Sequence, residues 1–352
     1  MSALIRFILI TAIIFSHACT TTNANDTGTS VDQKKSSVTF FSIMWKRFTN
    51  TVPHMEPSKP IPVSNPLPQL LDGTDDKLVK IGHSTVLIRI DNRWLITDPM
   101  FSERASPFSF AGPKRFHAPA IAITDLPKID AVIISHDHYD HLDEASIKSL
   151  INTTEHFIVP SRVDKHLLEW GVPKEKIIAL DRWESTTLDT VTVTATPSQH
   201  FSGRWLNDSN QTQWASWAIK GSKHNIFFSG DTGYFNGFKK IGEQLGPFDI
   251  TLLEAGAYNE MWDKIHMFPE QTLKAHRDLQ GKYMIPIHNS TFNLAFHAWF
   301  EPLEEIDRLA EPEDRVLTPA FGEEVKIASP LTTNKWWHPL LPWYRGGETA
   351  PN

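Results

Sequence analysis

The chain has 352 residues, of which 40% are apolar and 21% are charged, with 21 Phe and 12 Trp, so it is neither fibrous nor too polar to fold. The net charge of −7, without any block of basic residues, argues against a phosphate-backbone partner, and we expect no nucleic-acid binding. The single cysteine, Cys19, excludes an intrachain disulfide and a structural zinc site built from several thiolates.

Residues 1–18 are typical of an export signal. They contain one positive side chain, Arg6, and an apolar run over 7–15 that is too short to span a bilayer. A small residue, Ala18, precedes Cys19, which resembles the processing site of bacterial lipoproteins. This resemblance predicts a lipid on Cys19 and a membrane-anchored protein of the cell envelope that faces the periplasm. The alternative is an ordinary signal peptide that is cut nearby.

Residues 19–76 are predicted to form a tether and a proline-rich extension. Residues 20–35 are too polar to build a core. The aromatic stretch 38–48 is expected either to pack on the surface of the folded domain or to contact a membrane or lipid substrate. Because the candidate site residues run from His83 to His288, we expect one domain over 77–329.

The first ordered elements are predicted as a strand hairpin, with strands over 78–90 and 93–101 and a turn at Asp91-Asn92. Further strands are expected at 129–134, 157–160, 176–180, 191–196, 213–219, 225–229, 249–253 and 282–288. Helices are expected at 144–151, 163–170, 234–244, 269–279 and 302–309. Strand hairpins that alternate with helices predict an α+β fold with two sheets covered by helices on their outer faces. The aromatic tail 330–352 either packs back onto the domain or contacts a membrane.

The run ISHDHYDHLD follows the apolar strand 129–134 and contains four side chains that can bind metal: His136, His138, Asp140 and His141. Since alternate side chains of an extended segment point to one face, His136 and His138 can converge on one ion. Asp140 and His141 then turn toward a second ion. The alternative is a solvated polar loop, but the spacing favours a two-metal centre.

Four further motifs place a polar side chain at a strand end: TPSQH with His200, FFSGDTGY with Asp231, IPIHNSTF with His288 and KIGHST with His83. Gly230 lets the backbone turn and present Asp231 to a position between two ions. His200 and His288 would each complete a set of three protein ligands and leave a shared position for water. His83 either lies beside the metals or forms a hydrogen bond between neighbouring strands.

The order HxHxDH, then His, Asp and His, resembles that of the metallo-β-lactamase superfamily. The contexts GPKRF and TPSQH are similar to the branch that contains N-acyl-phosphatidylethanolamine-hydrolysing phospholipase D, and the similarity covers about residues 77–325. It implies a four-layer αβ/βα sandwich with two zinc ions between its sheets. Manganese or iron are alternatives, because ligand softness alone does not select the metal.

The resemblance also implies a role for each matching residue. The first metal would take His136, His138 and His200, the second Asp140, His141 and His288, and Asp231 would bridge them. Asp98 would hold ligand histidines by their second nitrogen, and His266 would lie beside the reacting phosphate. The implied reaction is attack by a metal-bridging hydroxide on a phosphodiester of N-acyl-phosphatidylethanolamine or a similar lipid, with Asp140 orienting the nucleophile and His266 assisting the leaving alcohol.

The chain departs from the branch pattern around the expected substrate pocket. It reads His288-Asn289-Ser290 where Trp-Gly is expected after the histidine, and Leu253-Glu254-Ala255 before the GAY motif. These departures keep two alternatives open, a metal-dependent lactonase or β-lactamase-like hydrolase of another small substrate and a non-catalytic envelope protein that binds metal or lipid. The sequence gives no indication of the oligomeric state.

Overall fold

The computed structural model describes residues 52–65, 73–205 and 207–344. The predicted export signal, Cys19 and the aromatic stretch 38–48 lie outside these residues, so their roles stay predictions. None of the helices in the described part is both long and apolar enough to pass through a bilayer.

The first of two sheets has seven strands in the order β13-β1-β2-β3-β4-β5-β6. Strands β3 to β6 are parallel to one another, whereas β1, β2 and β3 form an antiparallel meander. The strands are β1 (Lys77–Gly82), β2 (Thr85–Ile90), β3 (Arg93–Thr97), β4 (Ile129–Ile133), β5 (Thr154–Pro160), β6 (Ile177–Leu180) and β13 (Glu324–Lys326).

The second sheet has six strands in the order β12-β11-β10-β9-β8-β7. Strands β10, β11 and β12 are parallel, and β7 to β10 are antiparallel to their neighbours, so β8 runs in the same direction as β10. The strands are β7 (Ser185–Leu188), β8 (Val191–Thr196), β9 (Ser216–Lys220), β10 (Asn225–Phe228), β11 (Phe248–Glu254) and β12 (Gly281–Ile287).

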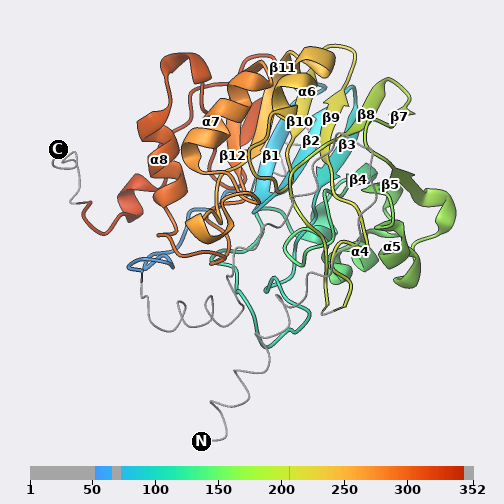
Figure 1. The fold of residues 1–352 in the computed structure, drawn as a ribbon, viewed down its shortest axis with the longest axis horizontal. Coiled ribbons are helices and arrows are strands. Elements are labelled where there is room, and N and C mark those ends of the chain that lie inside the picture. Colours follow the sequence, from blue (N-terminus) through green and yellow to red (C-terminus); the bar gives the residue numbers. More distant parts are fainter. Residues whose placement is uncertain (1–51, 66–72, 206, 345–352) are drawn as a thin grey trace, which may run out of the picture.

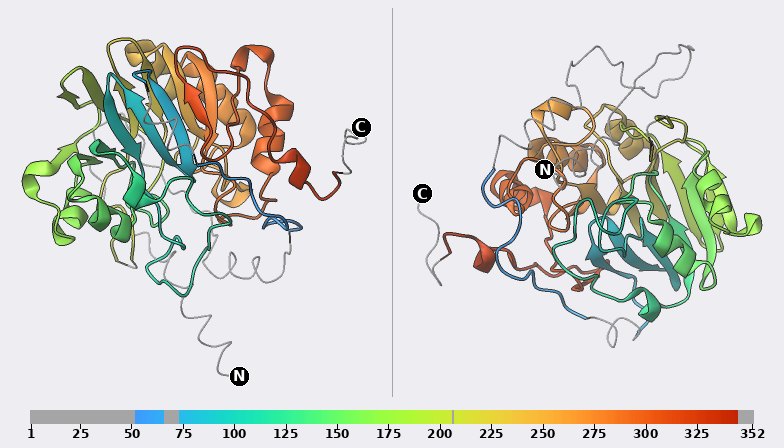
Figure 2. Two further views of the ribbon diagram at one scale, coloured as in Figure 1. Left: turned by 180° about the vertical axis from the view of Figure 1, so that it is seen from behind. Right: turned by 90° about the horizontal axis from the view of Figure 1, so that it is seen from below.

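Helices cover the outer face of each sheet (Figures 1 and 2). Helices α4 (Glu144–Leu150) and α5 (Asp164–Glu169) pack on the first sheet through side chains such as Ile147 and Leu167. Helices α6 (Gly237–Leu245), α7 (Pro269–Asp278) and α8 (Glu301–Leu309) pack on the second through Phe238, Leu273 and Ile306. The layers confirm the predicted α+β fold, an αβ/βα sandwich.

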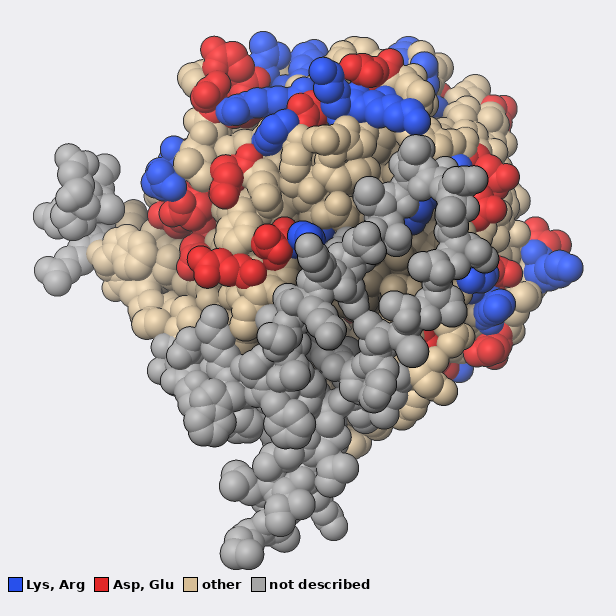
Figure 3. Space-filling model, in the orientation of Figure 1, with Lys and Arg blue, Asp and Glu red and all other residues tan. Residues whose placement is uncertain are grey.

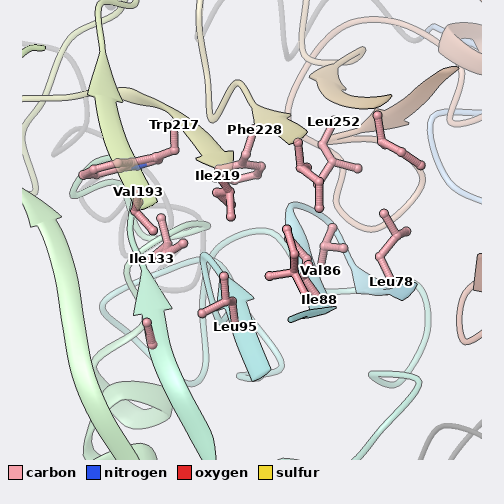
Figure 4. Close-up of a cluster of buried hydrophobic side chains, with 14 of the residues drawn as sticks. Leu78, Val86, Ile88, Leu95, Ile133, Val193, Trp217, Ile219, Phe228 and Leu252 are labelled. Atoms are coloured by element: carbon pink, nitrogen blue, oxygen red, sulfur yellow. The ribbon is translucent and has the colours of Figure 1, made fainter. Parts of the chain in front are cut away.

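The main core lies between the two sheets. On β2, Val86 and Ile88 point toward the second sheet, while Leu87 between them points toward the helices. Figure 4 shows Val86 and Ile88 opposite Phe228 and Leu252 of the second sheet. Each such buried side chain stabilises the fold by about 1.5–3 kcal/mol relative to an exposed one. The apolar alternation of the strands therefore fixes which face of each sheet is inside.

One prediction about the strands is wrong. The apolar run 78–90 is not one strand but two, β1 and β2, which are joined by a tight turn at His83 and Ser84. His83 has a positive φ of 37°, and its N–H donates to Thr291 Oγ1 at 2.8 Å. Gly82 and Ser84 beside His83 are residues that favour turns, but the apolar residues on both sides suggest one continuous strand. Strands β7 and β13 are also absent from the predicted elements.

The described part of the tail, residues 330–344, packs on the domain, as one of the two interpretations of its sequence expected. Trp337 is fully buried in a cluster with Ile61 and Phe321. Ser64, from the proline-rich extension, donates its N–H to the Phe321 carbonyl at 2.8 Å. The two extensions therefore meet on one side of the sandwich, while the domain boundaries at 77 and 329 stay predictions.

Charged side chains of both signs are mixed on the surface. On the face shown in Figure 3, Lys and Arg gather along the upper edge with Asp and Glu among them, and a broad uncharged surface lies below. Ion pairs such as Lys326 with Asp75, 2.9 Å apart, occur on exposed side chains. Water and salt screen exposed pairs of this kind, which therefore contribute little to stability, so the fold depends on the buried layers instead.

Candidate metal centre

The predicted site residues meet at one edge of the sandwich. The strand directions place the carboxyl ends of β8, β10, β11 and β12 at a single edge of the second sheet. In the first sheet, the carboxyl ends of β3 and β4 and the β1–β2 turn share one edge. The structure brings eight side chains together there: His83, His136, His138, Asp140, His141, His200, Asp231 and His288.

The first group of these side chains consists of three histidines and Asp231. His138 Nδ1 lies 2.8 Å from His136 Nε2 and 3.3 Å from His200 Nε2. Asp231 Oδ2 lies 3.9 Å from His136 Nε2 and 3.8 Å from His200 Nε2. The four donor atoms are all within 4.8 Å of one another, which is close enough for one divalent ion to contact them together.

The second group consists of His83, Asp140, His141 and His288. Asp140 Oδ2 lies 3.1 Å from His83 Nε2, 3.4 Å from His141 Nε2 and 3.2 Å from His288 Nε2. Asp231 reaches this group as well, with Oδ1 at 3.1 Å from His141 Nε2 and Oδ2 at 3.1 Å from His288 Nε2. One carboxylate, that of Asp231, is therefore shared between the two groups.

The chemistry of these donors fits divalent metal ions. Imidazole nitrogens and carboxylate oxygens are the ligands that zinc and its first-row neighbours prefer. His141 Nε2 and Asp231 Oδ1 are buried and 3.1 Å apart, but neither atom forms a hydrogen bond of good geometry with the other or with any other described residue. Buried polar atoms without a partner are rare in folded proteins, and a bound cation would satisfy both atoms.

Asp98 and Ser135 lie behind these histidines. Asp98 Oδ2 accepts from His141 Nδ1 at 2.6 Å, and Asp98 Oδ1 accepts from the Ser135 N–H at 2.7 Å. The Ser135 hydroxyl lies 2.8 Å from His136 Nδ1. Hydrogen bonds of this kind fix which ring nitrogen of a histidine is free for a metal. Asp98 holds one of the predicted ligands, His141, and Ser135, which the sequence analysis missed, supports another, His136.

His200 and His288 are held in position in different ways. His200 Nδ1 donates to the Ile265 carbonyl at 2.9 Å, so its Nε2 faces the first group. His288 Nδ1 is buried and has no hydrogen-bond partner among the described residues. Its orientation instead comes from its backbone, which has a positive φ of 61° at the end of β12.

The structure leaves no room for a side chain at Gly230, directly before Asp231. Its φ is +54°, and a Cβ at this position would lie 2.3 Å from Ser135 Cβ. No other residue fits, because both the backbone conformation and the close approach require glycine. The turn predicted from FFSGDTGY is confirmed, and it brings Asp231 to both groups.

The two groups differ in their electrostatics. Burial lowers the pKa of His136 and of His200 well below the usual value of 6.5. Burial also opposes charge on His141, but Asp231, Asp140 and Asp98 together raise its pKa well above that value. His288 behaves in the same way as His141. Burial opposes its charge, but the nearby carboxylates, mainly Asp231, outweigh burial and raise the pKa of His288 to about 9.

His266 lies next to both metal groups. Its partner is Glu254, a residue whose role was not predicted from the sequence. The His266 ring centroid is 5.3 Å from those of His200 and His288, and 12% of the His266 side chain is exposed. His266 Nδ1 is 2.7 Å from Oε2 of Glu254, a fully buried residue at the end of β11. Burial and the nearby Asp231 raise the pKa of Glu254 well above its usual value. The only sequence signal was an acidic residue that ends an apolar strand.

A small cavity opens beside His288. Its lining includes Asn289, Ser290, Phe292 and Trp299. Asn289 and Ser290 are the residues at which the chain departs from the branch pattern, so the departures face a space next to the second group.

Comparison with known proteins gives the family. The model of the β-lactamase superfamily domain matches residues 93–289. An uncharacterised protein of Mycobacterium tuberculosis (strain H37Rv) is 44% identical over 286 residues, which are 80% of this chain and 77% of that protein. The N-acyl-phosphatidylethanolamine-hydrolysing phospholipase D 1 of Caenorhabditis elegans is 34% identical over 254 residues, which are 68% of this chain and 71% of that protein.

Solved structures show the same fold. An isothiocyanate hydrolase from Delia radicum gut bacteria matches with a TM-score of 0.57 and 24% identity, over 71% of this chain and 98% of that one. A metallo hydrolase from the archaeon Ignicoccus hospitalis matches with a TM-score of 0.54 and 23% identity, over 72% and 98%. The predicted resemblance is confirmed: the chain belongs to the metallo-β-lactamase superfamily of metal-dependent hydrolases and is related to the phospholipases D that hydrolyse N-acyl-phosphatidylethanolamine.

Proposed function

We propose that the protein is a zinc-dependent phosphodiesterase of phospholipase D type, acting on N-acyl-phosphatidylethanolamine or a similar lipid. The observation that carries this proposal is the pair of metal-binding groups that share Asp231. Two adjacent cations are a common solution for phosphoester hydrolysis. Relationship to the nematode phospholipase, at 34% identity over 68% of this chain, favours a phosphodiester over other substrates.

In this proposal His136, His138 and His200 would hold one zinc ion, and Asp140, His141 and His288 would hold the other, with Asp231 shared between the two groups. Asp98 keeps His141 in the tautomer whose Nε2 is free. When bound, the two ions would supply positive charge that neutralises a phosphodiester oxygen and lowers the pKa of a nearby water.

The protein side chains then move the protons. Asp140 keeps 15% of its side chain exposed, so its carboxylate can orient the water that attacks phosphorus. The water oxygen would bond to phosphorus and lose a proton, while the bond from phosphorus to the alcohol oxygen breaks and the alcohol oxygen takes up a proton. His266, which is also partly exposed, stabilises the developing charge or donates a proton to the leaving alcohol.

We further propose that the protein is exported and anchored by a lipid on Cys19, at the periplasmic side of a bacterial envelope. A lipid anchor would keep the site near lipid substrates, since each buried methylene of an acyl chain contributes about 0.8 kcal/mol to membrane binding. Metabolic labelling with an alkyne fatty acid, compared between the wild-type chain and Cys19→Ala, tests this part separately. Equal labelling of both chains would exclude a lipid on Cys19.

The central experiment measures hydrolysis by the purified full-length chain in detergent. The substrates are N-acyl-phosphatidylethanolamine and bis-p-nitrophenyl phosphate, with and without a chelator, and metal content is measured on the same samples. We expect phosphodiester cleavage that the chelator removes and zinc restores. Asp314→Asn is a suitable control variant, because Asp314 is a buried carboxylate that pairs with Arg277 away from the centre.

Other outcomes would identify the rival functions. Cleavage of lactones or β-lactams without phosphodiester cleavage would favour a lactonase or β-lactamase-like hydrolase, and the changed residues Asn289 and Ser290 beside His288 give that alternative a structural basis. Full metal content without turnover of any of these substrates would favour a non-catalytic envelope protein.

A further inference from the structure

We infer that Glu254 is a positioning residue that fixes His266 in one tautomer, so that the Nε2 atom of His266 is the nitrogen presented to substrate. This inference rests on the proposed function, because it assigns a task to the residue that would assist the leaving alcohol. Glu254 is outside the seven predicted metal ligands, although its carboxylate and the donor atoms of Asp231, His266 and His288 lie within 4.8 Å of one another.

The carboxylate of Glu254 has a narrow set of contacts. Its Oε2 lies 2.7 Å from His266 Nδ1, and its Oε1 accepts from the Met267 N–H. Among the described residues, His266 is the one side chain that this carboxylate contacts by a hydrogen bond. Both oxygens are therefore used by adjacent residues of one loop.

The backbone of Glu254 is held without help from its carboxylate. The Glu254 N–H donates to Ser229 Oγ at 2.9 Å, and the Glu254 carbonyl accepts from Thr272 Oγ1 at 3.0 Å. These bonds attach the end of β11 to β10 and α7. Because strand and helix fix the backbone, a charged side chain is not needed here for the fold.

A buried carboxylate at this position is costly unless it has a specific partner. Glu254 is fully buried, and Asp231 contributes a second negative charge nearby. Burying a charge away from water is unfavourable unless hydrogen bonds or cations offset the loss of hydration. His266 supplies a hydrogen-bond partner, and cations in the adjacent metal groups would supply the positive charge that an ionised Glu254 needs.

The contacts determine the tautomer once Glu254 is ionised, a form that positive charge in the adjacent metal groups would favour against the raised pKa of this carboxyl. Oε1 accepts from the Met267 N–H, and an ionised Oε2 can only accept, so His266 Nδ1 then carries a hydrogen. His266 Nε2 then has a free lone pair or, after protonation, a proton to give. The 12% exposure of His266 contrasts with at most 1% for His141, His200 and His288, so this ring can meet a substrate.

The loop that carries His266 is fixed on its other side by the first metal group. The Ile265 carbonyl accepts from His200 Nδ1 at 2.9 Å, and the Lys264 carbonyl accepts from Gln199 Nε2 at 2.8 Å. His266 is thus held between a ligand histidine and a buried carboxylate, and its ring can keep a constant position relative to both metal groups.

The test compares the zinc-loaded full-length chain with Glu254→Gln. In the variant, the amide oxygen is needed by the Met267 N–H, so the amide NH₂ faces His266 Nδ1 and reverses the tautomer. Nitrogen-15 NMR of the histidine side chains, with His266 assigned from His266→Gln, should show hydrogen on Nδ1 in the wild-type chain and on Nε2 in Glu254→Gln. The same tautomer in both proteins would overturn the inference.

Turnover of bis-p-nitrophenyl phosphate gives a second, independent measurement. General acid–base residues typically contribute about 10²–10⁴-fold, so we expect Glu254→Gln to lower kcat by roughly 10²-fold at unchanged zinc content. In a His266→Gln background the same substitution should change kcat less than about 3-fold, since coupled residues are not additive. An equal loss in both backgrounds, or a loss of zinc, would contradict a role through His266.

A matched control is Glu301→Gln. Glu301 also accepts from one side chain and one backbone N–H, those of Tyr258 and Ala298, but it has no contact with His266. We expect wild-type turnover and an unchanged His266 spectrum. If no phosphodiester is cleaved by any variant, the proposed function fails, while the NMR comparison still decides the tautomer.

Discussion

The two metal-binding groups are built from similar side chains but have opposite proton affinities. In the first group, burial keeps His136 and His200 neutral by lowering their pKa well below 6.5. In the second, His141 and His288 lie against Asp140 and Asp231, and the pKa of His288 is raised to about 9. The difference is in the number of carboxylates, not in the histidines.

This comparison indicates an order of metal binding. A ligand histidine must be neutral, so an ion that enters the first group displaces no proton from His136 or His200. An ion that enters the second group must displace protons that Asp140 and Asp231 stabilise. We therefore expect the first group to fill first at neutral pH and the second to depend on pH.

The largest effect is expected from removing the charge that the groups share. Asp231→Asn takes away the carboxylate that contacts both groups, so two-metal occupancy and hydrolysis should both be abolished. Metal analysis by mass spectrometry and phosphodiesterase assays check this result. Normal activity with two bound ions would show that Asp231 is not the bridge.

A smaller and unequal effect is expected at Asp98, which contacts His141 of the second group directly and His136 of the first group only through Ser135. Asp98→Asn should weaken the second ion by about 10–100-fold, as typical for residues that orient a metal ligand, and weaken the first ion less. Competition with a zinc indicator measures both affinities. Equal weakening of both ions would remove the distinction between the groups, and Asp314→Asn serves as the buried control.

The pH dependence should separate the groups without any mutation. Because His288 and His141 must both lose a proton, the apparent affinity of the second ion should rise by at least about tenfold per pH unit between pH 6 and 8, below the His288 pKa of about 9, and that of the first should stay nearly constant. Zinc titrations at several pH values give both slopes. Parallel slopes would mean that the groups do not differ in protonation.

The thermal stability of the metal-free protein should fall as pH rises, whereas its affinity for the second ion should increase. Because the pKa of His288 is raised from 6.5 to about 9 in the fold, its stabilising contribution is complete below pH 6.5 and is lost as pH rises through 9. Thermal melts of the chelated chain should therefore show a falling Tm over this window. A melting temperature that rises between pH 6.5 and 9 would contradict the protonation assigned to the second group.

The smallest effect is expected at His83, which belongs to the second group by position. His83 Nε2 contacts Asp140 at 3.1 Å, and burial lowers the pKa of His83 to about 3, so the ring is neutral. If His83 only orients Asp140, His83→Asn should weaken the second ion by less than about tenfold. A loss of more than 100-fold, measured with the same indicator, would make His83 a direct ligand.

The metal groups could be predicted because their signal is local. Four of the seven predicted ligands lie in one run of ten residues after a strand, and Gly230 marks the turn before Asp231. The layers of the fold follow from apolar alternation, which is also local. These features need no knowledge of distant contacts; the comparisons confirm the fold, and the structure brings the predicted ligands together.

The supporting residues could not be predicted in the same way. Glu254 and His266 are 12 positions apart and meet only because a loop returns to the end of β11. The turn at His83 depends on Thr291, 208 positions away. Ser135 directly precedes the HxHxDH motif. Its hydroxyl has a role only because the fold places Asp98 on one side of it and His136 on the other. Long-range pairing, not composition, decides these roles.

The cluster of Ile61, Phe321 and Trp337 has a practical consequence for anyone who shortens the chain. Each extension covers apolar surface of the other, so the two extensions stabilise each other on the domain. Removing only the segment before β1 would leave Trp337 without part of its cover, and removing only the tail would uncover Ile61. A tag placed beyond Tyr344, which is 38% exposed, leaves the contacts between the two extensions intact.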